Sequence, residues 1–171
     1  SAGGTVIAGQ YLGRKDIVMA QKAADQLVWY VGLFSLAITA FAYIFKDFIL
    51  GTVFGSVAPD VMLNANKYFL VVAASIPAIA LFHAGSAIFK TTGDSKTSMK
   101  IVIIMNIINI AGNAFFIYVL HWDIIGVALP TTVSRYFSAI IMIFLTTRPK
   151  FILQLPRTLQ HNFDWKMVKR L

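Results

Sequence analysis

Four apolar stretches, each long enough to cross a lipid bilayer, dominate this chain; they occupy residues 27–45, 68–89, 101–120 and 124–147. The hydrocarbon core of a bilayer is about 30 Å thick and an α-helix rises about 1.5 Å per residue, so about 20 apolar residues cross it. A soluble helix of this length would need a polar face toward water, yet three of the four stretches contain no Lys, Arg, Asp or Glu. Because a backbone in lipid must satisfy its own hydrogen bonds, the sequence predicts an all-α, polytopic helical membrane protein.

Composition excludes several other classes of protein. Hydrophobic residues make up 58% of the 171 residues and charged residues only 13%, about half the charged share of a soluble domain. The sequence has no cysteine, P-loop, metal-ligand cluster or catalytic triad pattern, so we expect neither an enzyme nor a metal or other cofactor. A net charge of +8 would suggest nucleic acid if the protein were soluble. Basic loops on one side of a membrane explain that charge instead, and we expect no nucleic-acid partner.

The basic residues favour one side of the membrane. Of the 15 Lys and Arg residues, twelve lie in alternate connections, two lie in the others, and Arg135 lies within the last apolar stretch. The positive-inside rule places the richer side in the cytoplasm. All seven carboxylates are Asp, and we expect each of them outside the spans: Asp16, Asp25, Asp47, Asp60, Asp94, Asp123 and Asp164.

Three parts are expected along the chain. Residues 1–12 are apolar but would reach only about 18 Å as a helix, so we interpret them as the second half of a truncated transmembrane helix. Residues 13–150 are expected to hold the four-helix membrane part. Residues 151–171 are expected to form a cytoplasmic amphipathic linker on the membrane surface, because apolar residues recur there every four positions: Leu159, Phe163, Met167 and Leu171.

Three amides interrupt the third apolar stretch. Asn106, Asn109 and Asn113 are spaced by three and four residues, which places them within an arc of about 60° on one helix face. An amide in hydrocarbon needs hydrogen-bond partners, so this face is expected to point into protein or water. Two interpretations stay open, namely a polar stripe that lines a solute cavity, or interhelical hydrogen bonds worth about 0.6–2 kcal/mol each.

The fourth stretch combines a helix-disturbing proline with polar side chains. Pro130 is expected to kink the helix, and Thr131 and Thr132 follow it directly, so that freed carbonyls and hydroxyls make a polar pocket. Arg135 costs about 2.5–3.5 kcal/mol near the bilayer centre and should face a cavity or a carboxylate on a helix outside this chain, unless it lies nearer the interface. In the second stretch, Pro77 predicts a bend near mid-membrane.

The chain resembles the multidrug and toxic compound extrusion (MATE) family in four stretches. These are 9–16, similar to Q-x-x-G-x-x-D; 89–99, similar to R-x-x-G-D-x-x-x-P-M; 106–113, similar to N-I-I-N-I-x-x-N/D; and 126–135, similar to G-A-A-x-A-T-x-x-S-R. Lys90 stands for the usual Arg, Ser98 for the usual Pro, and Pro130 for an Ala. The four occur in the order and at the topological positions of the family.

The resemblance implies a fragment of a twelve-helix transporter of two six-helix lobes, running from the end of helix 2 to the linker after helix 6. Such proteins export cationic or amphipathic small molecules across the cell membrane by alternating access, coupled to inward H⁺ or Na⁺ flow. The family's site residues match Asn109, Asn113 and Thr131 here. Some relatives carry Asp at the position of Asn113, and an amide cannot titrate. The lipid bilayer and the C-terminal lobe would be the partners of this part. The secondary site candidates are Asn106, Thr132 and Arg135.

Two other functions stay open. A flippase of lipid-linked oligosaccharides, from the same superfamily, would need several cationic side chains in its cavity, and Arg135 is the only one within an apolar stretch. A membrane scaffold that transports nothing is the third possibility.

Overall fold

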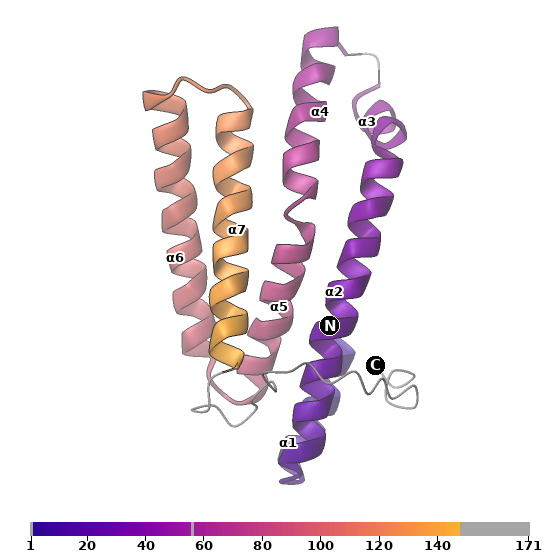
Figure 1. The fold of residues 1–171 in the computed structure, drawn as a ribbon, viewed down its shortest axis with the longest axis vertical. Coiled ribbons are helices and arrows are strands. Elements are labelled where there is room, and N and C mark those ends of the chain that lie inside the picture. The colour runs from indigo at the N-terminus through magenta and orange to yellow at the C-terminus, as the bar shows by residue number, and fades with distance from the viewer. Residues whose placement is uncertain (1, 56, 148–171) are drawn as a thin grey trace.

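A computed structural model describes residues 2–55 and 57–147 of the chain, and every regular element in these ranges is helical (Figure 1). The elements are α1 (Ala2–Gly13), α2 (Ile17–Ile44), α3 (Lys46–Phe54), α4 (Pro59–Ala73), α5 (Ile76–Thr91), α6 (Ser95–Ala114), the π-helical turn η1 (Phe115–Val119) and α7 (Ile125–Thr146). The linker expected over 151–171 lies outside the described residues.

Four helical segments of the described chain are long and apolar enough to cross a membrane: Ile17–Ile44, Pro59–Thr91, Ser95–Val119 and Ile125–Thr146. The expectation of an all-α, multi-span protein is confirmed. Three of these segments begin well before the apolar stretches that predicted them, and in two of them an aspartate caps the first turn. The Asp16 carboxylate accepts a hydrogen bond from the Met19 amide at 3.2 Å, and Asp94 accepts one from the Thr97 amide at 3.2 Å.

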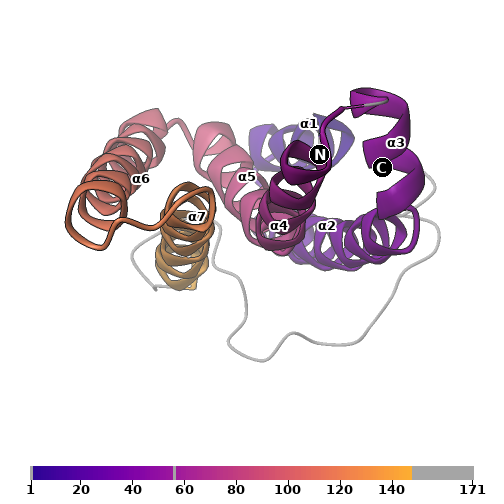
Figure 2. The same cartoon turned by 90° about the horizontal axis from the view of Figure 1, so that it is seen from above.

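The helices stand side by side in a curved layer (Figures 1 and 2). The α6–α7 hairpin forms one end of the layer, α4 and α5 lie beside α7, and α2 with α1 packs on the other side of α5. Only 6% of the apolar window of α6 is buried, against 39% for the α4–α5 segment. Helix α6 therefore uses one narrow face for packing within this part of the chain, and that face contacts α7 and, near the start of α6, also α5.

The α4–α5 segment is broken in its middle, as the ribbon in Figure 1 shows. Helix α4 ends at Ala73, and α5 begins at Ile76 with Pro77 in its first turn. Pro77 has no amide hydrogen to donate to the carbonyl of Ala73, and its ring crowds that carbonyl. The bend expected from Pro77 is thus a short interruption of the helix at 74–75.

Glycines allow α7 to approach both of its neighbours closely. A Cβ on Gly112 of α6 would lie 2.7 Å from Cβ of Pro130, and a Cβ on Gly85 of α5 would overlap Cγ of Met142. Helix α7 runs without interruption past Pro130, which is itself buried. Small residues at helix contacts allow this kind of packing in membranes, and here they fix the distance of α7 from α6 and from α5.

Candidate functional site

A chain of hydrogen bonds joins α6 to α7 beside the Gly112–Pro130 contact. Nδ2 of Asn113 donates to Oδ1 of Asn109 at 3.2 Å, and Nδ2 of Asn109 donates to Oγ1 of Thr131 at 3.0 Å. The Thr131 hydroxyl in turn donates to the carbonyl of Val127, one turn back on α7, at 2.9 Å. Two predicted site residues on one helix thus meet a third on the other.

The direction of these bonds follows from the threonine. Thr131 has one hydroxyl proton, and the Val127 carbonyl takes it, so Oγ1 can only accept from Asn109. The Asn109 amide nitrogen therefore faces Thr131, its oxygen faces Asn113, and Asn113 must present its own nitrogen to that oxygen. What remains is Oδ1 of Asn113, which is buried and has no hydrogen-bond partner among the described residues.

An unpartnered buried carbonyl oxygen is costly, at about 1–3 kcal/mol, and it accepts hydrogen bonds or coordinates cations but cannot donate. The end of the chain of bonds is therefore suited to a ligand that carries a proton donor or a positive charge. Helix-borne oxygens near the membrane midplane coordinate substrates and ions in transporters. None of Asn109, Asn113 and Thr131 changes charge near neutral pH, so the set can bind a cation but cannot carry a proton.

The other predicted residues lie elsewhere. Asn106 shares the face of Asn109, but its side chain is exposed and makes no hydrogen bond with the part of the chain that is described. The Thr132 hydroxyl donates to the Val71 carbonyl of α4 at 3.0 Å. Nη1 of Arg135 donates to Oγ of Ser75 at 2.6 Å. Thr132 and Arg135 thus contact the α4–α5 break rather than the amide chain.

Two aspartates that we expected outside the spans lie within helical segments long and apolar enough to cross a membrane, Asp60 in the first turn of Pro59–Thr91 and, deeper, Asp25 in Ile17–Ile44. Asp25 lies in the third turn of α2 and is only 7% exposed. Its Oδ1 has no hydrogen-bond partner among the described residues. The sequence signal was Asp16, which caps α2 and so extends the helix over the polar residues before the apolar stretch.

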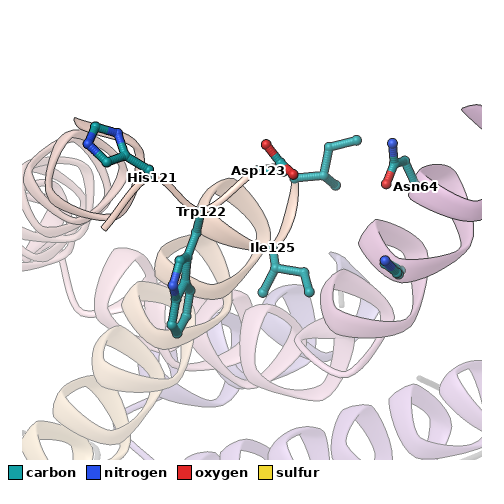
Figure 3. A pocket seen from close by; sticks show the side chains of 7 residues that line it. Asn64, His121, Trp122, Asp123 and Ile125 are labelled. Carbon is teal, nitrogen blue, oxygen red and sulfur yellow. The ribbon is translucent and has the colours of Figure 1, made fainter. Parts of the chain in front are cut away.

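A cleft of about 360 Å³ lies at the end of the bundle where α6 connects to α7, between α4 and this connection (Figure 3). Trp122 is seated there by its ring contact with Phe116, at 5.0 Å between centroids. The cleft mixes charges of both signs with apolar groups, and its lining is Asn64, Lys67, His121, Trp122, Asp123, Ile124 and Ile125.

The layer of long apolar helices defines a polytopic membrane protein, and one solved structure shares it. That structure, the inward-facing conformation of a multidrug resistance MATE family transporter of the MOP superfamily, superimposes with a TM-score of 0.86 at 19% identity. The match covers 98% of this chain and 38% of that one. It establishes the fold, including the arrangement of the helices around the amide chain.

The chain belongs to the MATE family, because the MatE family model matches residues 1–115. This is a family of transporters and not of enzymes, as the sequence resemblance implied. Protein DETOXIFICATION 43 of Arabidopsis thaliana is 33% identical over 71% of this chain and 24% of its own length. The uncharacterized transporter YisQ of Bacillus subtilis (strain 168) is 33% identical over 86% of this chain and 33% of its own. Multidrug and toxin extrusion protein 2 of Mus musculus is 28% identical over 51% of this chain and 15% of its own length. The chain therefore spans about a third or less of these relatives.

Proposed function

We propose that the protein containing this chain exports cationic or amphipathic small molecules across the cell membrane, in exchange for H⁺ or Na⁺. The observation that carries the proposal is the buried acceptor oxygen of Asn113, at the end of a chain of hydrogen bonds between two spans. Two similar proteins support it by name, one a multidrug and toxin extrusion protein and one a multidrug resistance transporter.

The amide chain would act as a reversible cation site. Asn109 and Thr131 hold each other across the α6–α7 contact, so the acceptor on Asn113 is oriented before the ligand arrives, which lowers the cost of binding. With Na⁺ as the coupling ion, the amide oxygens can serve as its ligands directly. With H⁺, the proton must reside on a titratable group, because an amide cannot hold it.

The test replaces the acceptor oxygen in the full-length transporter. Asn113→Leu keeps the branched shape of the side chain but removes its free oxygen, together with the Nδ2 donor to Asn109, and we expect KM for a fluorescent organic cation to rise about tenfold or more. Uptake is measured in membrane vesicles with an imposed Na⁺ gradient and, separately, an imposed H⁺ gradient.

Asn106→Leu is the matched control, because Asn106 lies on the same helix face but is exposed and outside the chain of bonds. Its transport should equal that of the unmodified protein. If Asn113→Leu also transports normally, the site assignment is wrong.

The flippase alternative has less support. A pyrophosphate needs cationic donors, and Arg135, the cation next to the amide chain along α7, donates to Ser75 instead. Binding of a lipid pyrophosphate to the purified protein, abolished by Arg135→Gln, would reverse this preference.

A further inference from the structure

Side chains of α7 hold the break between α4 and α5. Because the Ser75 amide turns to the Val72 carbonyl at 2.9 Å, the Val71 carbonyl loses its helical donor, and the hydroxyl of Thr132 takes that place. Ser75 itself is fully buried. Three residues of α7 reach the break: Thr132 donates to Val71 O at 3.0 Å, Arg135 to Ser75 Oγ at 2.6 Å, and Tyr136 to Ala74 O at 2.8 Å.

The groups of the break that face Arg135 are hydrogen-bond acceptors, as a guanidinium donor requires. The Ser75 hydroxyl donates its proton to the Val72 carbonyl at 2.6 Å, so its oxygen is free to accept from the guanidinium of Arg135. The last carbonyls of α4 add the partial negative charge of a helix C-terminus. This set of acceptors offsets part of the cost of a cation within a span, which is about 2.5–3.5 kcal/mol.

The same helix carries Thr131, the α7 member of the amide chain. At 100° per residue, Thr132, Arg135 and Tyr136 lie between about 40° and 140° around α7 from Thr131. Thr131 therefore faces α6 while the next face is bonded to the break. Glycine contacts fix how far α7 lies from its neighbours, but a helix at a fixed distance can still turn about its axis. The bonds to the break are placed to oppose that rotation.

We propose that Arg135, with Tyr136, is a positioning residue, which fixes the rotation of α7 against the α4–α5 break and so holds Thr131 in register with Asn109. The role rests on the proposed function of the amide chain. Arg135 does not contact the transported cation. Loss of its bond to Ser75 lets α7 turn, and the 3.0 Å bond from Asn109 to Thr131 lengthens.

A matched pair of tyrosines tests this role. Tyr136 of α7 and Tyr43 of α2 each donate to a carbonyl near the break, Tyr136 to Ala74 within it at 2.8 Å and Tyr43 to Leu70 in the last turn of α4 at 2.7 Å. Phenylalanine removes one hydrogen bond in either case, but only Tyr136 lies on the helix of Thr131. We expect Tyr136→Phe to raise KM for a fluorescent cation about threefold or more, with little change in kcat, and Tyr43→Phe to leave KM unchanged. Equal effects of the two variants would show a purely structural break and overturn the proposal.

A double-mutant cycle tests Arg135 itself in the full-length transporter. Arg135→Gln and Ser75→Ala should each raise KM about fivefold to tenfold, and the double variant should be no worse than either, because the two remove one shared contact. Arg135→Lys should recover part of the loss. Additive effects would overturn the proposal. Melting temperatures identify any variant that fails to fold. If Arg135→Gln or Ser75→Ala fails to fold, the KM values of Arg135→Lys and of the two tyrosine variants decide whether the positioning role holds.

The outcomes separate this role from the function on which it rests. Normal transport by Asn113→Leu would refute the amide site. Impaired transport by Asn113→Leu, together with unchanged KM in Arg135→Gln and Tyr136→Phe, would refute the positioning role alone.

Discussion

The substitution Gly112→Ala tests whether close contact between α6 and α7 is required for the amide chain. The new Cβ would lie 2.7 Å from Cβ of Pro130, and ordinary contacts between such atoms begin at 3.4 Å. The two helices must therefore separate by about 0.7 Å at this point. Asn109 is one turn away, and its 3.0 Å bond to Thr131 would lengthen to about 3.7 Å, beyond hydrogen-bonding distance.

The expected result is a loss of both affinity and stability. Overpacking costs about 1–3 kcal/mol, which exceeds the gain of about 1 kcal/mol from replacing a helical glycine by alanine. We expect the Kd of a fluorescent cation to rise about tenfold and the melting temperature of the purified transporter to fall. Binding is followed by fluorescence anisotropy and unfolding by a thermal shift assay.

Gly32→Ala is the control, because a Cβ there would lie 3.6 Å from Cδ2 of Leu81, an ordinary contact. This variant should keep its affinity and gain slightly in stability from helix propensity. Unchanged cation affinity in Gly112→Ala would refute the reasoning, since the amide chain would then not depend on the close approach of the two helices.

Two further predictions concern aspartates. Hydrogen bonds from the Thr97 side chain and amide hold the pKa of Asp94 below its usual range, with a smaller contribution from Lys100 and Lys96. A lowered pKa stabilises the folded state above the unfolded value of 3.8 and loses that effect as the pH falls through the folded value. The melting temperature of Asp94→Asn should therefore lie below that of the unmodified protein at pH 7, and the gap should close below pH 3.8; a gap independent of pH would contradict this. Asp25→Asn should raise the melting temperature, since it removes a buried acid that has no hydrogen bond to its Oδ1 among the described residues; a lower melting temperature would indicate a partner elsewhere in the transporter.

Hydropathy predicted the number and type of the membrane-crossing segments, because a long apolar run in lipid has few alternatives to a helix. It missed where some of them begin, because the first turns are polar and, in two segments, the boundary depends on a capping side chain. Asp16 and Asp94 are those caps. The misplacement of Asp25 followed directly from ignoring the first of them.

The polar face formed by the three asparagines was predictable, but which of them would bond to the neighbouring helix was not. The spacing of Asn109 and Asn113 predicted one polar face, yet nothing local separates Asn106, which is exposed, from the other two. Whether an amide meets a neighbouring helix depends on where the helices cross, and Gly112 and Pro130 decide that. The partner of Arg135 was also beyond sequence reasoning, because Ser75 accepts from it only through the local break in the helix.

The break also bears on how the chain fits bilayers of different thickness. As one straight helix, the 33 residues of Pro59–Thr91 would extend about 50 Å, or about 20 Å more than the hydrocarbon core. The break divides them into pieces of 15 and 16 residues, neither of which spans the core alone. The two pieces can lie at different tilts, because the Ser75 amide bonds to the Val72 carbonyl rather than to the Val71 carbonyl and so already interrupts the run of helical hydrogen bonds at the break. Hydrophobic mismatch, which a rigid span must absorb as whole-helix tilt or bilayer deformation, would here be met at a single joint, whose angle is set by the bonds from α7.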